Sequence, residues 1–364
     1  MAQVGAARAG TGASAGLSML ALALLGTRFV QGFIFWGGAS RRLFYDFRDI
    51  DGVDLALKLD FNAPGFVAAK LTHALPGALW VQGPIEATLA HPDLIVASVW
   101  LWTLAELAVG LALIFGLMTR AAAFVSFWLN VALMLIFGWM GSTCLDEWTM
   151  AVSGVAMSSA LFIAGSGAFS LDERLGRTAW AERNVWINWV ASGPLPEDSL
   201  RKLALALAAT CVAFTMLSYQ ILFGAVITPL HSRTNFHRHH IALSDVTVSS
   251  EGAVRFAAYV DAGPDTSAAY VIAARLVDRA GAVVAAWDGA ALAALPERAI
   301  RNDYPYVWAS RFKTETIGFS GQTGARATIA LPARANTGIA SGTTYQLVLE
   351  AIDGAVWRAP FGKS

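Results

Sequence analysis

The feature that most constrains this chain is a set of five long apolar runs. They occupy residues 16–38, 93–116, 121–140, 148–169 and 202–227. A helix needs about 20 consecutive, mostly apolar residues to cross the hydrocarbon core of a bilayer. Of all residues, 56% are hydrophobic and 14% are charged, against about 25% charged in an average soluble domain. The sequence therefore predicts an integral membrane protein, with the lipid bilayer as one of its partners.

The composition changes after Pro229. Short runs of β-branched and aromatic residues alternate with Gly, Asp and Pro turns between residues 241 and 352. This spacing predicts a small antiparallel, immunoglobulin-like β-sandwich over 236–364. The expected fold class is thus a membrane α-helical bundle of about five transmembrane helices, followed by an all-β domain.

The remaining segments set the expected domain boundaries. Residues 1–15 are small and polar and predict a disordered lead. Residues 39–92 are mixed, with an apolar stretch too short to span, so we expect an exterior segment within a membrane domain over 16–175. A basic cytoplasmic connector over 176–201 then leads to the fifth transmembrane helix, 202–228.

The arginines of the short loops predict the orientation. Arg120 and four arginines between residues 170 and 201 lie on one side, whereas the turn 141–147 has no Lys or Arg. Positive residues stay on the cytoplasmic side of the membrane. The pattern predicts a multi-pass protein of the bacterial inner (cytoplasmic) membrane, with the turn and the β-domain in the periplasm.

Ionisable residues occur inside two of the predicted spans. Arg28 and Glu106 lie at similar predicted depths. An ionised side chain at mid-bilayer costs roughly 3 kcal/mol, so each is expected to have a partner. We predict that Arg28 pairs with Glu106, joined by Gln31 or Asn130. Such a cluster either holds the bundle together or forms a proton path or the floor of a quinone pocket, and the residues alone leave both interpretations open.

The turn 141–148 carries an unusual set of side chains for a connector: Cys144, Asp146, Glu147 and Trp148. Acidic residues favour the positive end of a helix dipole, and tryptophan anchors at membrane interfaces, which gives a structural interpretation. The alternative interpretation is a functional site at one membrane face.

Several cofactor classes leave no signal in the sequence. None of the six histidines lies in the middle of a span, which removes the usual bis-histidine haem. No GxGxxG, Walker or CxxC motif points to a flavin, nicotinamide, nucleotide or iron–sulfur centre. The histidines from His231 to His240 are interpreted as an interfacial basic patch, so no metal is predicted. The 26 basic and 26 acidic residues give no reason to expect nucleic acid.

Three motifs resemble a known family: Arg28-x-x-x-Gly32-Phe-Ile-Phe-Trp36-Gly-Gly38 with Arg41, then Thr143-Cys144-x-Asp146-Glu147-Trp148, then Ser170-Leu-Asp172. They resemble DoxD, the membrane subunit of thiosulfate:quinone oxidoreductase and a relative of the DoxX group, whose four-helix bundle the first four spans would form. The exterior domain, with Ile300-Arg-Asn302-Asp-Tyr-Pro305, resembles the partner subunit DoxA. The resemblance covers roughly 16–175 and 205–360 and implies a DoxD–DoxA fusion.

The resemblance implies that two thiosulfate ions are oxidised to tetrathionate on the outer face and that a membrane quinone, as co-substrate, takes two electrons. Arginines bind such dianions through charge-assisted hydrogen bonds. The candidate substrate ligands are therefore Arg41, Arg42 and Trp148. A thiol can form the sulfur–sulfur adduct that a second thiosulfate displaces. The candidate catalytic residues are Cys144, Asp146 and Glu147.

The candidate quinone or proton-path residues are Arg28, Gln31, Trp36, Glu106 and Asn130. Two other functions stay open on the sequence alone. One is a non-catalytic DoxX-like membrane partner whose β-domain docks a periplasmic protein. The other is a quinone-linked oxidoreductase for another sulfur compound. Homo-oligomerisation is also left open.

Overall fold

The structure is a computed structural model that describes residues 2–45, 49–50, 53–54, 57–140, 146–224, 236–249, 251–334 and 344–362. Only the backbone is described for residues 2–18, 45, 49–50, 53–54, 146 and 182. The described residues group into two compact units. The first is drawn from 1–59, 96–134 and 146–231, and the second from 60–95, 135–145 and 232–364.

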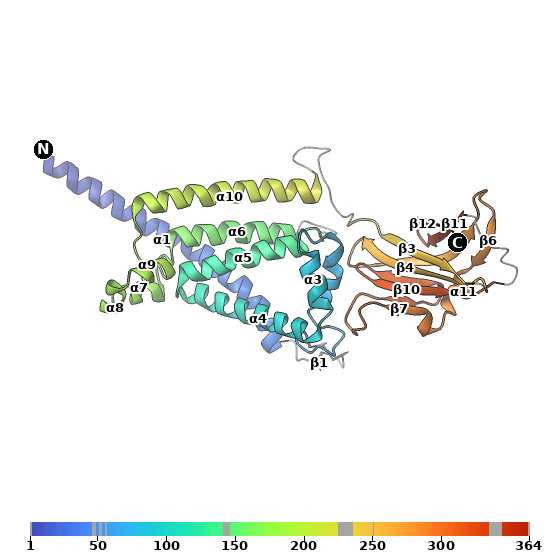
Figure 1. The fold of residues 1–364 in the computed structure, drawn as a ribbon. Coiled ribbons are helices and arrows are strands. Elements are labelled where there is room, and N and C mark those ends of the chain that lie inside the picture. Colours follow the sequence, from blue (N-terminus) through green and yellow to red (C-terminus); the bar gives the residue numbers. More distant parts are fainter. Residues whose placement is uncertain are drawn as a thin grey trace. The chain divides into compact units, whose positions relative to one another are not determined.

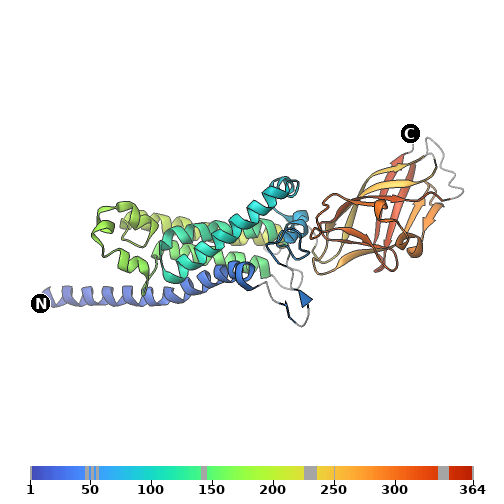
Figure 2. The same ribbon diagram turned by 90° about the horizontal axis from the view of Figure 1, so that it is seen from below.

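The first unit is built mainly from long apolar helices: α1 (Ala2–Ser40), α4 (Pro92–Phe115), α5 (Thr119–Phe137), α6 (Asp146–Ala164) and α10 (Glu197–Phe223). α1 and α10 both lie against α6 (Figure 1, Figure 2). Among the described residues, five stretches are long and apolar enough to cross a membrane: Met19–Phe44, Pro92–Phe115, Thr119–Phe137, Glu147–Ala164 and Glu197–Phe223. The predicted helical membrane part is thereby confirmed.

The first helix is longer at both ends than the sequence predicted. The disordered lead expected over 1–15 is helical from Ala2 onward, because this stretch is rich in alanine, the residue with the highest helix propensity. At the other end, the helix continues through Gly38 into a π-helical turn, η1 (Arg41–Tyr45). The spanning stretch accordingly ends at Phe44 and not at residue 38.

Shorter elements complete the first unit. The strands β1 (Asp49–Ile50) and β2 (Val53–Asp54) pair after η1, and the connector forms α7 (Leu171–Leu175), α8 (Ala179–Arg183) and α9 (Val185–Val190). Asp172 accepts hydrogen bonds from the backbone N–H groups of Met118 at 2.7 Å and Thr119 at 2.9 Å. It thereby satisfies donors at the start of α5. The Ser170-Leu-Asp172 motif therefore has a structural role.

The second unit contains two antiparallel sheets. One has the order β3 (His240–Val248), β4 (Val254–Ala262), β10 (Arg326–Leu331), β7 (Ile300–Asn302), and Figure 1 shows these strands side by side. The other has the order β12 (Val356–Gly362), β11 (Thr344–Ala351), β5 (Ala268–Val277), β9 (Phe319–Gln322), β8 (Phe312–Thr314), with β6 (Val283–Trp287) also paired to β5. The first order is A-B-E-D and β12-β11-β5 is G-F-C, as in the immunoglobulin fold. The helices α11 (Gly289–Ala293) and η3 (Glu297–Ala299) lie between strands.

One apolar core fills the space between the two sheets. Buried and less buried side chains alternate along β4 and β11, as the period of two in a strand requires. Inward-facing residues of both sheets, among them Phe256, Leu276 and Leu347, belong to one cluster. The core explains why the alternating runs after residue 240 form a sandwich.

Residues 60–95 belong to the second unit, whereas the sequence placed 39–92 within the membrane domain. They form α2 (Ala69–Ala74), η2 (Leu75–Gly77) and α3 (Gln82–Leu89). The Trp308 ring lies 5.4 Å from the Phe66 ring, and Tyr306 Oη donates to the Leu89 carbonyl at 2.8 Å. The boundary shifts because aromatic residues of a β-domain loop bind this segment, a contact that local polarity does not reveal.

Candidate functional site

The first unit contains a pocket of about 500 Å³ near the end of α1. Most of its wall consists of residues between 33 and 42, and the rest comes from Glu106 of α4, Asn130 and Leu133 of α5, and Met150 of α6. Four helices that are distant in sequence therefore meet around one space.

Several residues that the sequence singled out line this pocket: Trp36, Arg41, Arg42, Glu106 and Asn130. The sequence assigned the two arginines to a substrate site and the other three to a quinone or proton path. In the structure, the two arginines and the other three residues line the same pocket.

The polar end of the pocket is an ion pair between Arg42 of η1 and Glu106 of α4. Each side chain is only 10% exposed. Trp102 Nε1, one turn earlier on α4, donates to Glu106 Oε1 at 2.7 Å. A buried carboxylate needs such partners because its desolvation is costly. Sequence reasoning missed Trp102, although residues four apart share a helix face and this spacing was visible.

The predicted pair between Arg28 and Glu106 is wrong. Arg28 donates instead to two backbone carbonyls, from Nη1 to Ser166 at 2.5 Å and from Nη2 to Phe169 at 3.1 Å. Glu106 forms its ion pair with Arg42, a residue that the sequence placed beyond the end of the first span. The error follows from ending that span at Gly38.

Gly38 lies inside the continuous helix, next to the ion pair. A Cβ atom at this position would lie 2.9 Å from Glu106 Oε2 and 3.4 Å from Arg42 Nη2. The missing side chain therefore leaves room for the ion pair, and the glycine does not end the helix. The π-helical turn that follows is of a type frequent at functional sites.

Hydrogen bonds beside Asn130 join three helices. Asn130 Nδ2 donates to the Ser126 carbonyl at 2.8 Å, and its amide group occupies the space that a side chain at Gly154 would fill. Gln31 Nε2 donates to Ser126 Oγ at 2.8 Å, and the Ser126 and Ser158 hydroxyls lie 2.7 Å apart. Gln31 thus links α1 to α5 and α6 through the two serines, and Asn130 packs against α6 at Gly154. Neither residue bridges the ion pair that the sequence predicted.

Arg41 lies exposed at the pocket, where its Nε donates to the Gly37 carbonyl at 3.2 Å. Two arginines and one glutamate line the pocket, a formal excess of one positive charge.

The predicted catalytic turn is only partly described. Cys144 lies outside the described residues. α6 begins at Asp146, and Glu147 follows in the first turn, where the helix dipole favours negative charge. Glu147 precedes Met150 by three residues, which places both on the same face of α6.

Trp148 packs α6 against α10. Its Nε1 donates to Ser218 Oγ at 3.0 Å, and its ring lies 4.9 Å from that of Tyr219 and 6.3 Å from that of Phe223. Trp148 is outside the lining of the pocket. These contacts favour the structural interpretation of this residue over substrate binding.

Among the described residues, no group of three or more His, Cys, Asp or Glu is placed to hold a metal ion. His240 Nδ1 lies 2.6 Å from Asp261 Oδ1, and His239 Nε2 lies 3.3 Å from the Pro264 carbonyl. His231 lies outside the described residues.

The arrangement suits a ligand with a polar head and an apolar body. Aromatic and aliphatic side chains form most of the wall, and a few polar groups converge at one end, as in most small-molecule sites. Glu106 supplies a carboxyl that can exchange a proton with such a ligand. Arg42 stabilises the carboxylate that remains.

Comparison with known proteins gives two family matches. Residues 44–205 match the model of the TQO small subunit DoxD, and residues 223–360 match that of the TQO small subunit DoxA, where TQO is thiosulfate:quinone oxidoreductase. A solved structure of the Iho670 flagellar-like filament is 11% identical, covering 45% of this chain and 96% of its own, but its TM-score of 0.20 carries no structural argument. The chain thus belongs to the thiosulfate:quinone oxidoreductase small-subunit families, with a DoxD region and a DoxA region joined in one polypeptide.

Proposed function

We propose that this protein oxidises thiosulfate to tetrathionate and reduces a membrane quinone in the pocket at the end of α1. Two thiosulfate dianions, one quinone and two protons give one tetrathionate dianion and one quinol, which balances atoms, charge and electrons. The observation that carries the proposal is the Arg42–Glu106 pair at the polar end of an apolar pocket, in a chain that matches both TQO small subunits.

The pocket residues have distinct proposed roles. Trp36, with Phe35 beside it, holds the quinone ring by contact with its face, as aromatic side chains do. Arg42 and Asn130 are donors for the quinone oxygens, which gain negative charge on reduction. Glu106 exchanges protons with the ring oxygens. Its carboxyl is held near the ligand by the Trp102 indole.

Thiosulfate is proposed to bind at the outer end of the same region. Arg41 is exposed there, and the excess positive charge of the lining favours a dianion at its edge. A dianion inside the apolar part of the pocket would lose its hydration without enough partners. This desolvation cost is avoided if thiosulfate binds at a solvent-exposed site and the quinone binds at an adjoining apolar site.

Cys144 is proposed to link the two substrates. Its thiolate and one thiosulfate form a sulfur–sulfur bond, and the electron pair passes to the quinone, which takes two protons. The terminal sulfur of a second thiosulfate then attacks the adduct sulfur that is bonded to Cys144 Sγ. The bond to Sγ breaks, which releases tetrathionate and restores the thiolate. Glu147 and Asp146 are proposed as proton acceptors near this turn. Cys144 lies six residues before Met150, a residue of the pocket wall.

The proposed location is the bacterial cytoplasmic membrane, with the 141–148 turn and the β-domain in the periplasm. The arginines of the short loops support this orientation. A C-terminal alkaline phosphatase fusion should be active, and a C-terminal green fluorescent protein fusion should be dark. The opposite pattern would move every proposed exterior site to the cytoplasm.

The decisive experiment is thiosulfate-dependent reduction of a quinone analogue by the purified full-length protein. We expect turnover with tetrathionate as product at one per quinol, and at least tenfold less turnover in Glu106→Gln, a loss of about 1.4 kcal/mol of barrier stabilisation. Leu101→Ala, on the exposed face of α4, serves as the control. Absence of turnover in the wild type with every quinone tested would contradict the proposal.

The role of Cys144 has its own test. Cys144→Ser keeps size and hydrogen bonding but forms no sulfur–sulfur bond, so it should abolish activity at unchanged folded yield. Cys211→Ser is the matched control, because the Cys211 thiol lies within α10, 3.3 Å from Ser159 Oγ. If Cys144→Ser keeps a tenth of wild-type turnover, electrons pass directly from thiosulfate to the quinone.

A further inference from the structure

The pocket has an apolar opening on the side of the bundle. Three apolar residues of its wall are well exposed: Phe33 at 53%, Ile34 at 43% and Met150 at 41%. Phe33 and Ile34 belong to α1 and Met150 to α6, and the two helices lie against each other. Exposed apolar residues within a spanning helix face lipid. The opening between α1 and α6 therefore faces the acyl chains.

The depth of this opening separates it from water. Phe33 lies eleven residues before Phe44, where the spanning stretch ends. At 1.5 Å per residue this is about 16 Å, about half of a hydrocarbon core of about 30 Å. Arg42 and Glu106 lie toward the other end of the pocket wall. The pocket is thus polar near the interface and apolar deeper in the membrane.

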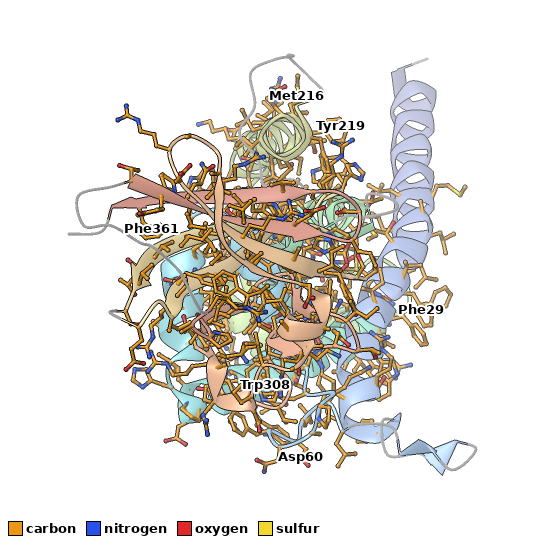
Figure 3. All side chains as sticks on the ribbon, turned by 90° about the vertical axis from the view of Figure 1, so that its right-hand side faces the viewer. Phe29, Asp60, Met216, Tyr219, Trp308 and Phe361 are labelled. Atoms are coloured by element: carbon orange, nitrogen blue, oxygen red, sulfur yellow. The ribbon has the colours of Figure 1, made fainter. Side chains whose placement is uncertain are left out.

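An apolar strip continues from the opening along α1. Phe29 and Phe33 lie one turn apart, and their rings stack at 5.8 Å with an angle of 20° between planes. Phe29 is also about half exposed, and Figure 3 shows it projecting from α1 away from the bundle. The strip leads from the pocket across the middle of the bilayer.

From these observations we propose that the ligand of the pocket is a quinone with a long isoprenoid tail, which enters sideways from the bilayer between α1 and α6. The tail lies across Phe33, Ile34 and Met150 and continues along Phe29. The inference rests on the proposed function for the identity of the ring. It adds the entry route and the residues that contact the tail.

The test compares two quinones with the same ring, one with a tail of several isoprene units and one without a tail. The full-length protein is placed in lipid nanodiscs, as wild type, Met150→Trp and Phe33→Ala. Met150→Trp narrows the opening and Phe33→Ala removes tail contacts. Each should raise the KM for the tailed quinone about tenfold, because each disturbs close contacts with the tail, and about ten van der Waals contacts are worth this factor. The KM for the tail-less quinone should change less than twofold.

Leu101→Trp provides the matched control, since Leu101 is 73% exposed on α4 and lies outside the pocket. It should leave both KM values unchanged. If Met150→Trp and Phe33→Ala leave the tailed quinone unaffected, or weaken both quinones equally, the lateral entry is wrong although the pocket still reduces quinone.

A binding measurement separates this inference from the proposed function. The Kd of each quinone for the same nanodiscs is measured without thiosulfate, by quenching of tryptophan fluorescence. If the wild type shows no thiosulfate-dependent turnover, the proposed function fails. A tenfold higher Kd in Met150→Trp and Phe33→Ala than in the wild type, for the tailed quinone alone, would still support the entry route. An unchanged Kd for the tailed quinone overturns it.

Discussion

The two units of this protein both bury apolar side chains, but they differ in the polar groups they bury and in the apolar side chains they expose. In the second unit, Phe256 and Trp287 are at most 1% exposed and belong to an apolar core. In the first unit, Gln31 and Asn130 are 1% and 3% exposed, whereas Leu101 is 73% exposed. The membrane bundle thus keeps polar groups inside and presents apolar ones outside.

The difference reflects the solvent of each unit. Burial of apolar surface stabilises the β-domain because that surface leaves water. Lipid is as apolar as leucine, so helices in a bilayer are held by close contacts and hydrogen bonds instead. In the first unit, some of the residues that hold the helices together, namely Arg42, Glu106 and Asn130, also line the pocket. In the second unit, stability and any surface function rest on different residues.

The largest expected effect is loss of one partner of the buried ion pair. Glu106→Gln leaves Arg42 buried without its counter-charge and should lower the unfolding free energy of the first unit by about 3–5 kcal/mol. Glu106→Gln combined with Arg42→Gln should cost clearly less. Hydrogen–deuterium exchange of the full-length protein in detergent reports the first unit separately from the second.

Comparison of single and double variants also tests whether Glu106 pairs with Arg42 and not with Arg28. Arg28 and Glu106 do not meet in the structure, so the costs of Arg28→Gln and Glu106→Gln should add within about 0.5 kcal/mol. A coupling energy well above that value would restore the pair that the sequence predicted.

Helix contact through glycine should give the next largest effect. A Cβ atom at Gly154 would overlap the Asn130 amide, so Gly154→Ala should lower the unfolding free energy of the bundle by about 1–3 kcal/mol. Gly26→Ala on α1 is the control, because nothing lies within 4 Å of its added atom. Equal effects of the two substitutions would show that close contact does not hold the bundle.

An ion pair in the second unit should matter much less than that of the first. Arg326 Nη2 lies 2.7 Å from Glu86 Oε1, with side chains 29% and 42% exposed. Water screens such a pair, so Glu86→Gln should lower the unfolding free energy by less than about 1 kcal/mol. A loss as large as that of Glu106→Gln would contradict the contrast between the two units.

The smallest expected effect concerns pH. Burial lowers the pKa of His73 on α2, Lys70 lowers it further, and Asp265 partly offsets both. The unfolded chain then binds a proton at about pH 6.5, before the folded one does. The stability that depends on neutral His73 is complete above that pH and is lost as the pH falls below it.

His73→Gln removes this dependence. Between pH 7.5 and pH 5.5 the Tm of the second unit should therefore fall less in the variant than in the wild type. An equal fall in both proteins would assign the pH dependence to the carboxylates.

The sequence predicted what depends on local pattern. The five membrane helices follow from run length, and the two-sheet domain follows from alternation and turn residues. The ion pair of Glu106 was not predicted. The sequence gives the depth of a residue along its helix, but the choice of partner also depends on how each helix is rotated about its axis and on where α1 ends. Gly38 suggested a helix end, but its role is to make room for Glu106.

The pocket itself was predictable only in part. Trp36, Glu106 and Asn130 were selected as polar or aromatic residues in or near spans, and the structure brings them together. Met150 and Leu133 carry no signal, because an apolar residue in a span resembles its neighbours until the tertiary contacts are known. The docking of residues 60–95 on the β-domain was hidden for the same reason.

The central claim is that the pocket at the end of α1 is the quinone site, and photolabelling tests it most directly. The full-length protein in nanodiscs is irradiated with an azido-quinone, and the labelled peptides are identified by mass spectrometry. We expect label on residues 33–42 and near Met150, suppressed by excess quinone and reduced in Met150→Trp. Specific label confined to the second unit, or to helices away from these residues, would contradict the account.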